Sequence, residues 1–195
     1  MEKKWFIDII IAIVIGLVAT SCQTYSLKSG DLLFHVVSQG NAITDVTPGM
    51  IDHVAIVMSR DSVIEAVGKG VKMTPIDSLR QQDGHYLVGR VKGIDSKQSI
   101  ANAKHYFGRP YDRLYLPNND AIYCSELVQL SFVDKHGKRL FSPIPMSFHD
   151  TTGRITDYWR QFYAKHQLEV PEGEPGTNPG ELSQRTNVKL KGRLR

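Results

Sequence analysis

Two β-rich runs separated by three polar residues constrain the fold of this chain most strongly. The first is "DHVAIVM" (52–58), the second is "SVIEAV" (62–67), and "SRD" lies between them, a pattern typical of a β-hairpin. If the hairpin turns about Ser59, His53 stands opposite Glu65, and opposed residues share one face with Cβ atoms about 5 Å apart. A register shift of one residue would separate the two side chains. The spacing therefore predicts a His53–Glu65 pair.

The rest of the pattern combines neighbouring strands with a few helices. Apolar runs bounded by Gly and Pro predict further strands, and helical spacing after polar capping residues predicts helices. The expected strands lie over 30–37 and 85–93, and the expected helices lie over 96–107, from about 123, and over 154–166. This alternation is typical of the α+β class. We expect one such domain over 30–169, a length that suits a single core.

The first 21 residues are typical of an export signal. A short basic head precedes the apolar run Ile9–Ala19, which is too short to cross a bilayer, since crossing needs about 20 residues. The run ends in "ATSC", which resembles the lipobox of bacterial lipoproteins and implies lipidation of Cys22. An uncleaved anchor or an ordinary secreted signal are the alternatives. We expect an extracytoplasmic, membrane-anchored protein, sorted to the periplasmic side of the outer membrane, with a tether over 22–29.

The last 26 residues, 170–195, are rich in Pro and Gly and then basic. Such a composition predicts a disordered tail; the alternative is a basic segment that binds anionic wall or lipid. The net charge of +4 is modest, and the basic residues are not interleaved with aromatic residues. Nucleic acid is therefore not expected as a partner.

Cys124, in "AIYCSELVQL", allows two interpretations. Free cysteine is among the most buried residue types, and Leu127 and Val128 flank it on the helix surface, so it could simply fill the core. If the helix begins near Tyr123, however, unpaired N–H groups and the positive end of the helix dipole favour a reactive thiolate there. The same N–H groups could stabilise a developing oxyanion.

A nucleophilic cysteine needs a base, and His53 is the strongest candidate among seven histidines. The other six, including His35, are expected in exposed loops, helix faces or strand ends. Glu65 could orient one ring nitrogen of His53 and leave the other to accept the thiol proton, as in catalytic triads. Glu65 could instead be a carboxylate on an exposed strand face, and Asp31 is expected to be structural.

The segment around Cys124 resembles the nucleophile segment of NlpC-type papain-like hydrolases. The matching residues are Gly108, Pro110, Tyr111, Cys124, Ser125, Leu127, Val128 and Gln129. Because Gly30-Asp31, His53 and Glu65 precede the cysteine, the order is similar to the circularly permuted YiiX/YaeF type of amidases. The resemblance covers about residues 29–150 and implies a permuted papain-like fold with a central antiparallel sheet. It also implies a Cys124–His53–Glu65 triad, with Tyr111, Tyr123 and Ser125 as pocket or oxyanion residues.

These features predict a cysteine amidase or peptidase that acts on a cell-envelope amide or acyl bond, such as one in a peptidoglycan stem peptide. A lipid acyl hydrolase or acyltransferase resembling lecithin retinol acyltransferase remains an alternative, as does an inactive binding module. We expect a monomer that needs no metal or organic cofactor, because no His, Cys and Asp cluster has ligand spacing.

Overall fold

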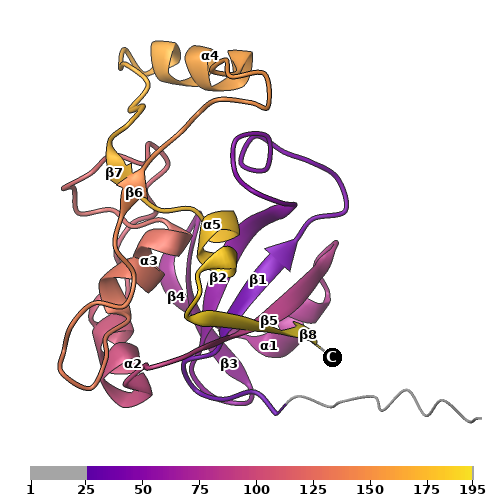
Figure 1. Cartoon of the computed structure of the whole chain (residues 1–195), viewed down its shortest axis with the longest axis vertical. Helices are drawn as coiled ribbons and strands as arrows, with labels where there is room; N and C mark the ends of the chain where they lie inside the picture. Colours follow the sequence, from indigo (N-terminus) through magenta and orange to yellow (C-terminus); the bar gives the residue numbers. More distant parts are fainter. Residues whose placement is uncertain (1–25, 195) are drawn as a thin grey trace, which may run out of the picture.

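The computed structural model describes residues 26–194, so the expected signal peptide and Cys22 lie outside the described residues. Six strands form one antiparallel sheet in the order β4-β3-β2-β1-β5-β8 (Figure 1). They are β1 (Leu32–Val36), β2 (Ile51–Val57), β3 (Ser62–Val67), β4 (Gly70–Pro75), β5 (His85–Val91) and β8 (Val188–Arg193). The prediction of an α+β domain with a central antiparallel sheet is confirmed.

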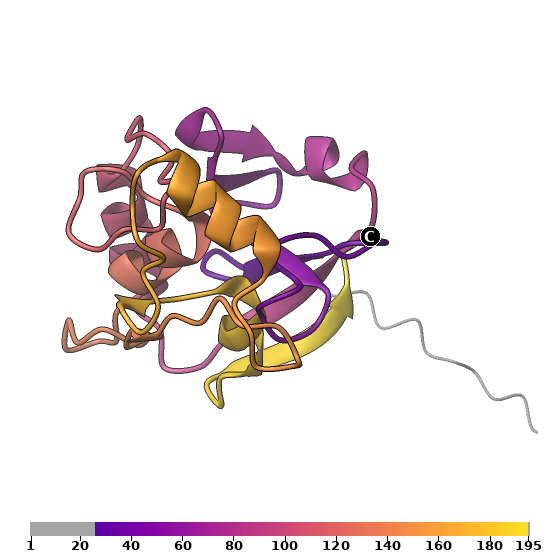
Figure 2. The same cartoon turned by 90° about the horizontal axis from the view of Figure 1, so that it is seen from above.

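The other regular elements of the described residues are five helices and one small two-stranded sheet. The helices are α1 (Ile76–Arg80), α2 (Ser96–His105), α3 (Cys124–Ser131), α4 (Asp157–Lys165) and α5 (Pro179–Gln184), and the small sheet pairs β6 (Ile144–Pro145) with β7 (Pro175–Gly176). Helices α2 and α3 pack together beside the large sheet, whereas α4 stands beyond β6 and β7 (Figures 1 and 2). Within residues 26–194, no helix has the length and apolar character needed to cross a membrane.

Successive side chains of a strand point to opposite faces of the sheet, so the core consists of two clusters. Leu32 and Phe34 of β1 belong to the cluster that includes α3, whereas Leu33 belongs to the cluster that includes α1. All three side chains are fully buried. The sheet therefore buries apolar residues on both faces. This packing fixes the positions of the polar residues at the strand ends.

The predicted hairpin forms, but its register differs from the prediction. Val57 pairs with Val63 and not with Asp61, so the turn centres on Arg60 instead of Ser59. The turn residues explain the difference, because the amides of Met58 and Ser59 both donate to the carbonyl of Ser62. Each residue thus moves by two positions against its partner, which leaves every side chain on its predicted face.

The prediction of a disordered tail over 170–195 is wrong for the described residues 170–194. This segment forms β7, α5 and β8, and β8 pairs with β5 along five registered residue pairs. The few apolar residues of the segment carry its packing: Leu182 is fully buried in the same cluster as α3, and Val188 packs against that cluster. The domain therefore extends well past residue 169.

The described part of the expected tether, residues 26–29, packs against the domain. Arg90 donates to the backbone carbonyl of Ser26, and Leu27 packs against the second core cluster. The guanidinium of Arg90 also donates twice to the carboxylate of Asp31, over 2.9 and 2.8 Å, and Lys28 donates its amide to the same carboxylate. Asp31 is thus a buried structural residue, as expected.

The two edges of the large sheet differ. At one edge, β4 is covered, because Val71 exchanges backbone hydrogen bonds with residues 108 and 109. At the other edge lies β8, which carries Lys189, Lys191 and Arg193.

Candidate active site

Cys124 occupies the first position of α3. Tyr123 before it has the extended backbone of an N-cap residue, with φ −98° and ψ 168°. Leu127 and Val128 on the following turn are buried and fix the helix against the sheet. Cys124 is therefore held at a helix start, where the first N–H groups have no partner within the helix.

His53 and Glu65 come from adjacent strands and touch. Nε2 of His53 lies 2.8 Å from Oε2 of Glu65, and the hydroxyl of Thr74 on β4 donates to Oε1 of Glu65 over 2.5 Å. Glu65 is only 3 % exposed. Burial alone would raise the pKa of Glu65, but the hydrogen bonds from His53 and Thr74 lower it, so the carboxylate stays ionised. The register shift therefore left the predicted pair intact, with the two residues as diagonal neighbours on one face.

His53 also contacts Cys124 through a side-chain hydrogen bond. Because Glu65 holds Nε2, the nitrogen left to face the thiol is Nδ1. Burial alone would lower the pKa of His53, but the hydrogen bonds to Cys124 and Glu65 raise it to about 10. At neutral pH the imidazole therefore carries a proton beside the sulfur. The structure brings together the three residues that the sequence singled out.

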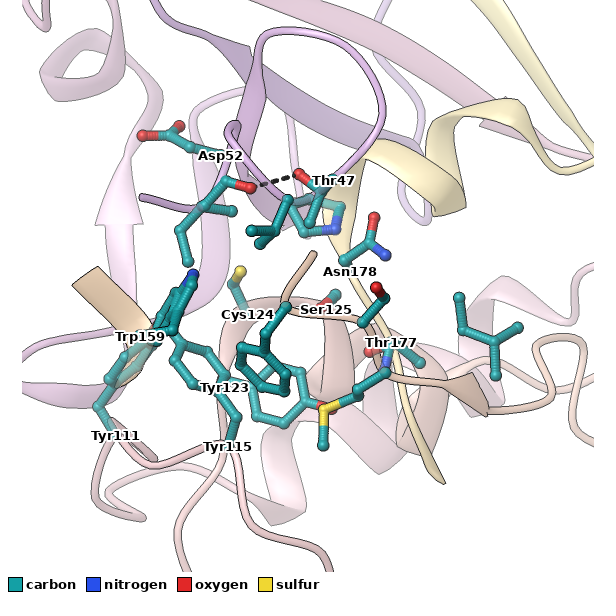
Figure 3. Close-up of a pocket in the computed structure, with 17 residues that line it drawn as sticks. Thr47, Asp52, Tyr111, Tyr115, Tyr123, Cys124, Ser125, Trp159, Thr177 and Asn178 are labelled. Carbon is teal, nitrogen blue, oxygen red and sulfur yellow. Dashed lines mark hydrogen bonds between the residues drawn. The ribbon is translucent and has the colours of Figure 1, made fainter. Parts of the chain in front are cut away.

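A cleft opens beside Cys124 and encloses about 550 Å³ of space, part of which is open to solvent. In Figure 3 the Cys124 sulfur lies between Asp52 and Thr47 on one side and Tyr123 and Trp159 on the other. Most of the lining is apolar or aromatic and comes from five parts of the chain: Ile43, Val46, Tyr111, Tyr115, Tyr123, Ile144, Met146, Phe148, Trp159 and Pro179. The cleft therefore suits an apolar group next to the sulfur.

Tyr111, Tyr123 and Ser125 all line this cleft. Burial raises the pKa of Tyr111, so its hydroxyl stays protonated and can donate. The hydroxyl of Tyr123 accepts a hydrogen bond of 3.1 Å from the amide of Thr177, which fixes it against the C-terminal wall of the cleft. The hydroxyl of Ser125 is buried and has no partner among the described residues.

Sequence reasoning missed the part of the cleft that the C-terminal segment supplies. Thr177, Asn178 and Pro179 line it, and they belong to the stretch predicted to be disordered. A local signal was present: the side chain of Asn178 accepts from the amide of Glu181 over 2.7 Å, and Pro179 occupies the first helical turn. Asn followed by Pro and then Glu is typical of a helix start.

Three features define the class of papain-like cysteine hydrolases with a permuted sequence. They are the antiparallel sheet, the cysteine at a helix start beside a strand-borne histidine, and the order His53, Glu65, Cys124 along the sequence. The chain belongs to the permuted papain-like amidases of the YaeF/YiiX type, the C92 family, whose model matches residues 26–189. The members of this family are described as permuted papain-like amidase enzymes.

Two similar proteins agree with this assignment. An uncharacterized protein, YiiX of Escherichia coli strain K12, is 33% identical over 135 residues, which are 64% of this chain and 66% of YiiX. The alignment thus spans slightly less than two thirds of that relative. A crystal structure titled as the metalloprotein YiiX from Escherichia coli O157:H7 has the same fold, with a TM-score of 0.72, 24% identity, and coverage of 87% of this chain and 99% of that chain.

The solved YiiX structure is described as that of a metalloprotein. Within residues 26–194, no group of three or more His, Cys, Asp or Glu side chains is arranged to hold a metal ion. The donor set near Cys124 therefore does not fit a bound metal.

Proposed function

We propose that Cys124, His53 and Glu65 form the catalytic triad of an extracytoplasmic hydrolase that cleaves an amide or related acyl bond. The support is His53, which contacts both Glu65 and Cys124 and holds a proton at neutral pH. The imidazole of His53 carries the proton that the thiol gives up in the reaction, and the sulfur acts as the nucleophile. Glu65 fixes the ring and stabilises its positive charge.

The reaction proceeds through a thioester. The Cys124 sulfur adds to the carbonyl carbon, and the carbonyl oxygen becomes an oxyanion. When the intermediate collapses, the bond to the leaving group breaks and the imidazolium of His53 gives its proton to that group. Water then attacks the thioester carbon while His53 takes a proton from the water, the bond from that carbon to the Cys124 sulfur breaks, and the carboxylic acid leaves.

The start of α3 supplies the oxyanion site. The amides of Cys124 and Ser125 are at the first turn of a helix, where N–H groups are unpaired within the helix and the dipole is positive. Such donors act on the charge that develops in the transition state, and loss of one can slow an enzyme about 100- to 1000-fold. Tyr111 stands in the same cleft, where its hydroxyl is hydrogen-bonded to Tyr115.

The substrate is a component of the cell envelope. An exported protein tethered through a lipid at Cys22 would meet the amide bonds of peptidoglycan stem peptides. A second candidate, the acyl bond of a membrane lipid, is favoured by the lining of the cleft, in which aromatic and aliphatic side chains such as Trp159, Phe148 and Ile43 predominate. Both substrates would place a carbonyl group at Cys124. They differ in the group that would occupy the cleft, which is part of a peptide in one case and an acyl chain in the other.

One experiment separates these candidates. The protein is incubated with muropeptides and, separately, with phospholipid vesicles, and mass spectrometry follows both the products and an acyl adduct on Cys124. Cleavage of one substrate by the wild type but not by Cys124→Ala identifies the bond. Binding of a substrate with neither product nor adduct would support the inactive binding module instead.

Lipidation has its own test. If Cys22 is the mature N-terminus, mass spectrometry detects a lipid-modified peptide that begins at Cys22, and Cys22→Ala releases the protein from the membrane fraction. A mature chain that keeps Met1, or a Cys22→Ala variant that fractionates like the wild type, would refute it.

A further inference from the structure

A second histidine–carboxylate pair borders the cleft. Nδ1 of His35 lies 2.7 Å from Oδ1 of Asp52, and Nε2 of His35 lies 2.6 Å from the backbone carbonyl oxygen of Asp83. The side chain of His35 is only 14% exposed. The sequence-based expectation of an exposed His35 is therefore wrong, because its neighbours in β2 and β5 cover it.

The two contacts of His35 require two N–H donors. A carbonyl oxygen and an ionised carboxylate only accept hydrogen bonds, whereas neutral imidazole has one donor and one acceptor. Asp52 is ionised, since hydrogen bonds from His35 and Asn41 outweigh burial and lower its pKa. Both contacts are therefore satisfied at once only when His35 is an imidazolium.

The pair connects to one wall of the cleft. Oδ2 of Asp52 accepts a hydrogen bond of 2.7 Å from the side-chain amide of Asn41. The carbonyl oxygen of the Asn41 side chain accepts from the amides of Ile43 and Thr44, over 3.0 and 3.2 Å. Asn41 thus shapes the segment 41–47, three of whose residues line the cleft: Ile43, Val46 and Thr47.

Segment 41–47 is also hydrogen-bonded to α4. The indole Nε1 of Trp159 donates to the carbonyl of Ala42 over 3.1 Å, and Trp159 lines the cleft from the opposite side to Asp52 (Figure 3). Any movement of segment 41–47 would therefore change both sides of the space next to Cys124.

We propose that His35, Asp52 and Asn41 form a protonation-dependent latch that holds segment 41–47 in place as a wall of the substrate cleft. His35 acts as a positioning residue, because it touches neither Cys124 nor the cleft. When His35 loses a proton, one of its ring nitrogens carries a lone pair and can no longer donate to Asp52 or to the carbonyl of Asp83. The latch then loosens. The latch deepens the proposed function and rests on it, because it shapes the cleft that receives the substrate.

Several charged or titratable groups surround His35. Asp52 and His53 face it from β2, His85 and Tyr86 from β5, and Asp83, whose carboxylate accepts from Ser38, from the segment before β5. The hydrogen bond to Asp52 raises the pKa of His35, although burial opposes the shift. A group with a raised pKa stabilises the fold fully below its unfolded value and loses this effect as pH rises through the folded value. The latch is therefore closed below pH 6.5 and opens as pH rises through the raised pKa of His35.

Amide hydrogen exchange of the full chain, measured by mass spectrometry on peptides that cover segment 41–47, tests the latch without turnover. After correction for intrinsic rates, wild-type protection of this segment should fall at least 10-fold between pH 6 and pH 9. His35→Phe keeps the ring beside Tyr86 but removes both donors, so it should exchange at least 10-fold faster at pH 6 and show no further fall. His105→Phe, on α2 and exposed, is the matched control and should behave like the wild type.

Asp52→Asn provides a second variant if His35→Phe fails to fold, which circular dichroism would reveal. It removes the charge that His35 faces and should also expose segment 41–47 at pH 6. Wild-type protection in both variants, or in whichever one folds, would overturn the latch. So would protection that stays constant from pH 6 to pH 9 in the wild type. Neither result depends on whether Cys124 hydrolyses a substrate, so the latch and the proposed reaction can fail separately.

Discussion

The hydroxyl of Thr74 donates a 2.5 Å hydrogen bond to Oε1 of Glu65, the carboxylate whose other oxygen lies 2.8 Å from Nε2 of His53. Three adjacent strands, β4, β3 and β2, thus contribute one residue each to a continuous hydrogen-bonded chain that ends at Cys124. The orientation of His53 depends on a residue that does not touch the thiol.

Thr74→Val should slow turnover about 10-fold, equivalent to ~1.4 kcal/mol in the barrier. The substitution keeps the shape of the side chain but leaves one oxygen of a buried carboxylate without its donor. Steady-state kinetics would measure the effect, with the rate of Cys124 alkylation as a substrate-free readout. Thr74→Ser keeps the hydroxyl and should retain most of the activity. Equal rates for Thr74→Val and the wild type would contradict a role of Thr74 in orienting Glu65.

Stability should fall at alkaline pH through His53. Its pKa is raised from 6.5 to about 10, so the stabilisation is fully present below pH 6.5 and is lost as pH rises through about 10. Urea unfolding between pH 7 and pH 10.5 would measure the decline. In Glu65→Gln the pKa of His53 should be lower, so the decline should begin at lower pH, while the fold at pH 6 persists. Identical profiles for the two proteins would show that Glu65 does not hold the proton on His53.

Leu182→Ala should lower the free energy of unfolding by about 2–5 kcal/mol, because it empties a fully buried position in the main core. The control is Leu190→Ala in the same C-terminal segment, where the side chain is 43% exposed and the cost should stay below about 0.5 kcal/mol. Urea unfolding compares the two. Equal, small effects would mean that the C-terminal segment is not part of the folded domain.

Asp31→Ala should lower stability by up to ~3 kcal/mol, since removal of one partner leaves a partly buried Arg90 without its carboxylate. Asp157→Ala breaks an exposed ion pair with Arg160 and should cost ~0–1 kcal/mol. Turnover per folded molecule should stay unchanged in Asp31→Ala, because Asp31 contacts Arg90 and Lys28 and not the cleft. A large loss of turnover in fully folded Asp31→Ala would indicate that it acts on the site.

The residues of the site were predictable because their signals are local or periodic. The hairpin pattern placed His53 and Glu65 on one face, and the apolar spacing after Tyr123 placed Cys124 at a helix start. The register error arose from hydrogen bonds within the turn, where Ser62 accepts from two amides. It did no harm to the site, because a shift by two positions preserves the face of every residue.

Contacts between distant parts of the chain could not be predicted in the same way. Strand β8 adds to β5 after about 100 residues, and its composition alone is typical of a tail. The setting of His35 depends on Asp52 and Asp83, which the fold brings to it from two other segments. Neither contact produces a periodic pattern of apolar and polar residues from which it could be predicted.

The unequal edges of the large sheet bear on how the molecules behave at high concentration. An uncovered strand can recruit a strand from another molecule, and lysine and arginine side chains on the edge discourage this by repulsion between like charges. Since β4 is covered by residues 108 and 109, the basic residues of β8 protect the edge through which sheets of two molecules could join. Neutralising Lys189, Lys191 and Arg193 together would therefore favour the pairing of two molecules through their β8 strands while leaving the interior of each molecule intact.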